Sequence, residues 1–98
     1  MRVLLSGFVA AVALISATAA QAADGQTVYN QSCGLCHNAM KPKLGDKAVW
    51  APLLKQGTDA MVASVIKGKG AMPPRAGKPS LSDADIKAAV EYIESKSQ

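Results

Sequence analysis

The 98-residue sequence has few of the residues from which metal sites and aromatic cores are built. It contains two cysteines, one histidine, one tryptophan, two tyrosines and one phenylalanine. The cysteines and the histidine supply three metal ligands at most, too few for a structural zinc site with four protein ligands. Strand patterns are missing as well, because no stretch of useful length alternates β-branched or aromatic residues with polar ones. The chain is therefore expected to be all-α.

Charge of one sign is not in large excess either. The sequence has eleven basic and seven acidic residues, and Arg2, one of the basic ones, lies in a segment that we expect to be removed. The remaining positive surplus is too small and too dispersed to indicate a nucleic-acid partner. It is compatible with docking on an acidic protein surface.

The first 22 residues have the pattern of an export signal. Arg2 gives a positive start, the stretch 3–20 is apolar apart from small residues, and Ala20-Gln21-Ala22 matches a small-x-small cleavage site. About 18 apolar residues can also span a membrane, but the alanine content and the cleavage pattern favour removal. We expect a cleaved signal peptide at 1–22, a periplasmic location without a stable membrane anchor, and one domain at 23–98.

The predicted domain has a thin core for its size. A chain this short is marginally stable on side-chain packing alone and often depends on a staple or a cofactor. Residues 23–98 contain one tryptophan, two tyrosines and a scatter of Val, Leu, Ile and Met. A large, flat, apolar cofactor at the centre would complete such a core.

Three main helices are predicted, with two long irregular stretches between them. The first helix covers about 25–33, the second begins with Thr58 as its N-cap and ends at Gly68, and the third begins at Ser82. A shorter helical turn, interrupted by Pro52, is expected at 47–55. Stretches such as 38–56 and 68–79 are uncommon in a compact domain unless they serve a function, so we expect them to surround a bound group.

The pentapeptide Cys33-Gly34-Leu35-Cys36-His37 is the haem c attachment pattern and holds both cysteines and the single histidine. Cysteines three apart on a helical turn project the same way and can bond two vinyl groups of one porphyrin. The histidine that follows is then placed to bind the iron. A plain disulfide or a thioredoxin-type redox pair are the alternatives, but the latter belongs near a βαβ pattern that this sequence lacks.

A second axial ligand must come from another residue type, because there is no second histidine. Methionine sulfur is a common partner in electron-transfer haems, and the candidates are Met40, Met61 and Met72. Met40 follows His37 too closely to reach the opposite haem face, and Met61 lies on the apolar stripe of a helix. Met72 stands in a stiff segment, after glycines and before two prolines. The alternative for Met72 is an ordinary loop methionine that covers the core.

The chain resembles class I c-type cytochromes, and more closely the small bacterial cytochrome c-five branch. The resemblance rests on the haem motif, on the segments 45–52 (Gly-Asp-Lys-Ala-Val-Trp-Ala-Pro) and 68–74 (Gly-Lys-Gly-Ala-Met-Pro-Pro), and on a C-terminal helix. It implies a small fold of three main helices plus loops around one covalently bound haem c. It also implies that Met72 is the distal iron ligand and that Trp50 packs beside the haem near a propionate. The alternative for Trp50 is a plain core aromatic whose indole N–H has another partner.

The resemblance further implies that the first and last helices cross at small and aromatic residues. Gly25 and Tyr29 match the first pair, and Ala89 and Tyr92 match the second. Close approach of two helices at small residues is physically reasonable, since it lets their ridges interlock.

The expected function is that of a periplasmic one-electron carrier between redox proteins, monomeric and not an enzyme. The alternatives are a fixed haem subunit of a dehydrogenase or oxidase, and a ligand-binding or peroxidatic haem with a labile Met72 bond. Basic residues flank the motif and the methionine segment, and they form either a collar that steers acidic partners or ordinary solvated loops. These residues are Lys41, Lys43, Lys47, Lys67, Lys69, Arg75 and Lys78.

Overall fold

The N-terminal helix is longer than the sequence pattern predicts. The computed structural model describes residues 24–98, so the predicted signal peptide and its cleavage site lie outside the described residues. The helix runs through α1 (Gly25–Val28), η1 (Tyr29–Cys33) and α2 (Gly34–His37). η1 is a turn of π-helix, wider than an α-turn, and the helix continues past it to His37, so all of the haem motif lies on it.

The middle of the chain forms two helices. α3 (Lys47–Leu54) forms where the helical turn is expected, but it contains Pro52 without being interrupted there. The Asp46 carboxylate caps it by accepting a hydrogen bond from Val49 N at 3.4 Å. α4 (Thr58–Lys67) has Gly57, not Thr58, at its N-cap, so the predicted cap is wrong. The Thr58 hydroxyl instead donates to Glu94 Oε2 at 3.1 Å, which ties α4 to the C-terminal helix.

The C-terminal helix α5 (Asp83–Ser97) has a complete capping box. Ser82 Oγ accepts from Asp85 N at 3.0 Å, and Asp85 Oδ2 accepts from Ser82 N at 3.2 Å. The buried face of α5 is an apolar stripe at helical period. That stripe consists of Ile86, Ala89, Val90 and Ile93.

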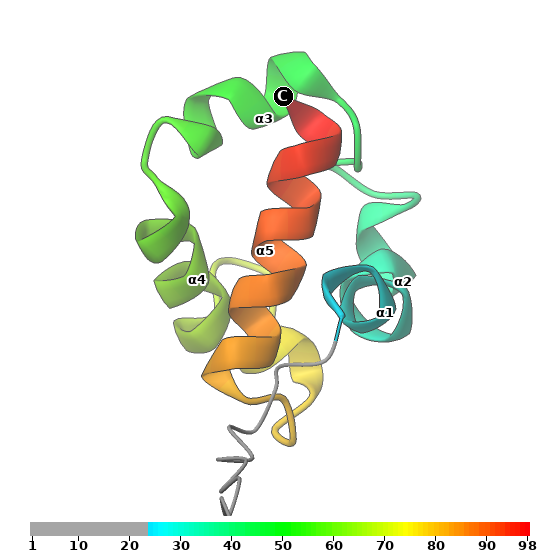
Figure 1. Cartoon of the computed structure of the whole chain (residues 1–98), viewed down its shortest axis with the longest axis vertical. Coiled ribbons are helices and arrows are strands. Elements are labelled where there is room, and N and C mark those ends of the chain that lie inside the picture. Colours follow the sequence, from blue (N-terminus) through cyan, green and yellow to red (C-terminus); the bar gives the residue numbers. More distant parts are fainter. Residues whose placement is uncertain (1–23) are drawn as a thin grey trace, which may run out of the picture.

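The helix α5 crosses the centre of the described part, as Figure 1 shows, with α1 and α2 on one side, α4 on the other and α3 across its C-terminal end. Tyr29 and Tyr92 pack together where the N-terminal helix contacts α5, with ring centroids 5.3 Å apart. Gly25 lies so close to α5 that a Cβ there would be 2.2 Å from the carbonyl oxygen of Ala88. The crossing of small and aromatic residues is therefore present, with Ala88 supplying the backbone nearest to Gly25.

Within residues 24–98 the only β-type pairing is an isolated bridge between Lys69 and Met72, so the all-α class is confirmed. The short helix η2 (Pro74–Gly77) follows Met72 and leads to α5. None of the helices in this part of the chain has the length and apolar character needed to cross a membrane.

Candidate functional site

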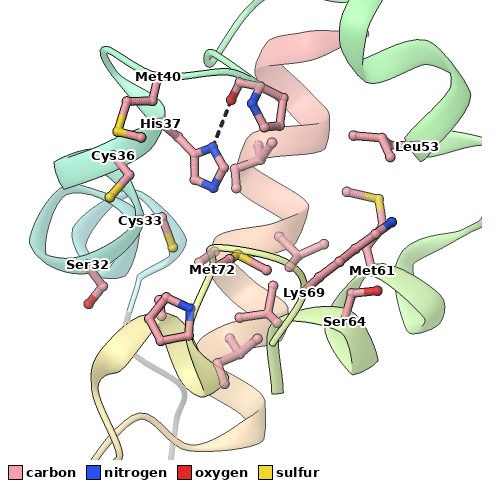
Figure 2. Close-up of a pocket in the computed structure, with 18 of the residues that line it drawn as sticks. Ser32, Cys33, Cys36, His37, Met40, Leu53, Met61, Ser64, Lys69 and Met72 are labelled. Carbon is pink, nitrogen blue, oxygen red and sulfur yellow. Dashed lines mark hydrogen bonds between the residues drawn. The ribbon is translucent and has the colours of Figure 1, made fainter. Parts of the chain in front are cut away.

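A cavity of about 500 Å³ lies between the helices, and every predicted site residue lines it. The helix η1–α2 contributes Cys33, Cys36 and His37, while Met72 enters from the loop before η2 (Figure 2). α3 supplies Trp50. The buried stripe of α5 forms an apolar wall of the same cavity. Segments that are distant in sequence thus meet around one space.

No disulfide joins the two cysteines, of which Cys33 is half-buried and Cys36 exposed. Burial raises the pKa of the Cys33 thiol, against smaller lowering effects from its backbone hydrogen bond and from Lys78. Redox-active cysteine pairs need the opposite, a depressed pKa that makes the thiolate available. The direction of this shift gives no support to the thioredoxin-type alternative.

His37 is held in one orientation by the chain itself. Its Nδ1 lies 2.8 Å from the carbonyl oxygen of Pro42. Because a carbonyl oxygen can only accept, Nδ1 carries the proton and donates it to this bond. In the neutral imidazole, the lone pair is then on the other ring nitrogen, Nε2, the form in which a histidine binds a metal.

All three candidate methionines line the cavity, but they occupy different places. Met40 is 60% exposed and lies beside His37 and Cys36 on the same wall (Figure 2). Met61 is buried on α4 as part of the apolar core cluster. Met72 is half-buried, and its position is set by a tight turn in which it exchanges both backbone hydrogen bonds with Lys69 at 3.0 Å.

Trp50 is buried, and its ring lies 5.8 Å from the His37 ring, centroid to centroid, at an interplanar angle of 53°. Its indole N–H donates to the carbonyl oxygen of Lys43 at 2.8 Å. The expectation that Trp50 lies near a haem propionate stays a prediction. What the structure adds is a protein partner for the indole N–H.

The basic residues around the cavity divide into two groups. Arg75 donates to Leu81 O at 2.9 Å and pairs with Asp83 at 2.7 Å, and Lys78 donates to Gln31 O, so these two tie loops together. The others are exposed lysines, two of which line the cavity itself. Those two are Lys41 and Lys69.

The cavity fits a large, flat, mostly apolar group such as haem. Its volume lies within the range of ligand pockets, roughly 300–1,000 Å³. Its walls are mainly apolar, and two thiols stand beside an imidazole whose Nε2 is available. A thioether from Met72 or Met61 completes a donor set that suits haem iron.

Sequence reasoning missed the polar partners of this site. Asn38 accepts from the Tyr29 hydroxyl at 2.7 Å, and the Pro42 and Lys43 carbonyls accept from His37 and Trp50. Backbone carbonyls are present in every residue, so no sequence signal identifies the two that are used. Asn38 follows the haem motif directly and is the one polar side chain that could have been named.

Comparisons with known proteins agree with this geometry. Residues 20–93 match the family described as "Cytochrome C oxidase, cbb3-type, subunit III". The chain is 40% identical to cytochrome c-555 of Chlorobaculum tepidum, with 99% of this chain and 98% of that protein covered. It is 35% identical to cytochrome c5 of Azotobacter vinelandii, with 70% of this chain and 89% of that protein covered.

A solved structure shows the same likeness. It is a chain of the crystal structure of an electron transfer complex of nitrite reductase with cytochrome c. The TM-score is 0.73 at 47% sequence identity, with 76% of this chain and 94% of that chain covered. Helical fold, cavity, motif and relatives thus lead to one conclusion. The chain belongs to the cytochrome c family, as a class I cytochrome that carries one covalently attached haem c.

Proposed function

We propose that this chain is a periplasmic one-electron carrier in which Cys33 and Cys36 hold the haem, and His37 and Met72 bind its iron. The observation that carries the proposal is that these four side chains line one cavity. His37 comes from the helix that contains the cysteines, and Met72 comes from a separate loop (Figure 2). Relatives named as cytochromes c-555 and c5 support a carrier.

The haem, when bound, supplies an iron that takes up and releases one electron, and the chain supplies its setting. The Pro42 carbonyl holds His37 in the tautomer that leaves Nε2 available. The Lys69–Met72 turn holds the methionine in place from the other segment. Two protein ligands leave no position for oxygen or peroxide, and sulfur ligation with burial raises the reduction potential.

The carrier's docking surface is proposed to be the mouth of the cavity. Its exposed lining includes Met40, Lys41, Lys69 and Pro73, and none of the described residues that line the cavity is acidic. A basic rim around an apolar centre complements an acidic patch on a redox partner. The relative solved with nitrite reductase supports a redox protein as that partner. Electron transfer to an acidic partner should then slow as ionic strength rises.

The test of axial ligation compares two methionine variants of the haem-loaded protein. The ferric wild type should show the weak long-wavelength absorption band of methionine-sulfur ligation. Met72→Ala should lose this band, whereas Met61→Ala, which removes the other inward methionine, should keep it. A band that survives in Met72→Ala would exclude Met72 as the ligand. Rapid carbon monoxide binding by the reduced wild type would favour a labile, ligand-binding haem.

Two further measurements address location and assembly. Mass spectrometry of the protein from a periplasmic fraction should give a mature N-terminus after Ala22. Gel filtration of a native extract should give a free species of monomer size. Haem co-eluting only with a large complex would instead support a fixed subunit of a dehydrogenase or oxidase.

A further inference from the structure

The indole of Trp50 is committed to the protein backbone. Trp50 is 5% exposed, and its Nε1–H donates to the Lys43 carbonyl at 2.8 Å. An indole nitrogen has one hydrogen and no acceptor capacity. This bond therefore uses the polar function of the side chain, and it fixes one carbonyl of the segment that follows the haem motif.

The carbonyl next to it in the chain serves His37. Pro42 and Lys43 are consecutive residues, and the Pro42 carbonyl accepts from His37 Nδ1 at 2.8 Å. The same segment is closed by Leu44 N donating to His37 O at 2.8 Å. Lys43 itself is exposed, so its side chain adds little packing that would hold the segment. The Lys43 carbonyl also accepts from Asp46 N at 3.1 Å, and the half-buried Leu44 packs against the core. The indole is the only buried side chain that bonds this carbonyl among the described residues.

We propose that Trp50 is a positioning residue for the iron-binding histidine. By holding the Lys43 carbonyl, it keeps the adjacent Pro42 carbonyl in line with Nδ1 of His37. This inference rests on the proposed ligation by His37. A hydrogen bond from Nδ1 makes an imidazole more electron-rich and a stronger ligand of oxidised iron. Trp50 thus acts on the haem through two carbonyls and the histidine, without donating to a propionate.

The test is Trp50→Phe in the haem-loaded protein, since Phe keeps an aromatic ring in the wall and removes the N–H. The ring N–H of His37 in the reduced protein should exchange with solvent about fivefold faster, the size expected for one net hydrogen bond. The reduction potential should shift to more positive values, because the less electron-rich imidazole stabilises oxidised iron less. Unchanged exchange and potential would overturn the role given to Trp50.

A matched control is Val49→Ala. Val49 precedes Trp50 on α3, is half-buried and does not line the cavity. Truncating Val49 should lower the free energy of unfolding, but the exchange rate of the His37 ring N–H and the reduction potential should stay unchanged. Equal shifts in both variants would mean that Trp50 acts through the stability of α3 alone, and would overturn the proposal.

A measurement on the wild type keeps the proposal testable if Trp50→Phe fails to fold. The indole N–H should show nuclear Overhauser contacts to the Lys43 α-proton and the Leu44 amide. Contacts to haem propionate protons alone would overturn the proposal. In the same sample, covalent attachment of haem and the methionine absorption band are measured as a separate test of the proposed function. A wild type with both, but with the indole on a propionate, would reject only the role of Trp50.

Discussion

Tyr29 links buried packing to the pH dependence of stability. Its hydroxyl donates to Asn38, and its ring packs on Tyr92. Burial raises the pKa of the Tyr29 hydroxyl above its ordinary value, with smaller contributions from Cys33 and Tyr92. A group whose pKa is higher in the folded than in the unfolded state contributes its full stabilisation at pH values below its unfolded-state pKa, which is about 10 for tyrosine. That contribution is lost as the pH rises through the folded pKa.

We therefore expect the free energy of unfolding to fall with pH above about 10, more steeply in the wild type than in Tyr29→Phe. The variant should be less stable at neutral pH by about 1 kcal/mol, because it lacks the bond to Asn38. Urea unfolding of both haem-loaded proteins across this range measures the two slopes. Parallel slopes would show that Tyr29 does not titrate in this way.

The methionine loop depends on a glycine that no other residue can replace without a clash. Gly68 has φ of 84°, and a Cβ there would lie 2.9 Å from both Met72 O and Pro74 N. Gly57 has φ of 90° at the other end of α4, and a Cβ added there would meet nothing within 4 Å. The two glycines share a backbone conformation, so an alanine substitution causes backbone strain at both but a steric clash only at Gly68.

Gly57→Ala should cost about 1–3 kcal/mol of stability through strain alone and keep the methionine absorption band. Gly68→Ala should be less stable than Gly57→Ala and should lose or weaken the band, because the loop that presents Met72 must move. Absorption spectra and thermal unfolding of the two variants provide the comparison. Identical spectra and stabilities would contradict a steric role for Gly68.

The crossing of α1 and α5 gives a second prediction at the scale of elements. Alanine is normally about 1 kcal/mol better than glycine within a helix. A Cβ at Gly25 would nevertheless meet the Ala88 carbonyl at 2.2 Å and Tyr92 Cβ at 3.3 Å. Gly25→Ala should therefore lower the free energy of unfolding by about 1–3 kcal/mol, the usual cost of overpacking. The exposed neighbour Gln26 supplies the control, since Gln26→Ala should change it by less than about 0.5 kcal/mol in the same urea titration.

At the scale of the whole molecule, the cavity determines what the chain can do without haem. Without haem the mainly apolar walls of this cavity lose the group that would cover them, in a domain whose whole stability is about 5–15 kcal/mol. The double variant Cys33→Ala/Cys36→Ala, which cannot attach haem, should therefore lose cooperative thermal unfolding and its near-ultraviolet circular dichroism. Native-like values of both would show that the helices support the fold unaided.

The sequence by itself determined the features that depend on local spacing and side-chain chemistry. Cys33, Cys36 and His37 are adjacent on one helical turn, so their joint role follows from the pentapeptide alone. The start of the third helix at Ser82 was equally readable, because its apolar residues recur at helical period within the helix itself, and the capping box that the structure adds is also local. A resemblance to class I cytochromes then supplied the architecture around them.

Only the tertiary structure decided which groups far apart in the chain become partners. Thr58 reads as a helix cap, yet its hydroxyl bonds Glu94, 36 residues away. Gly45 N donates to the Ser97 hydroxyl across 52 residues. The carbonyls that hold His37 and Trp50 are chemically the same as all others in the chain, and packing alone selects them. Local sequence encodes helices and motifs, whereas these pairings exist only once the helices have closed around the cavity.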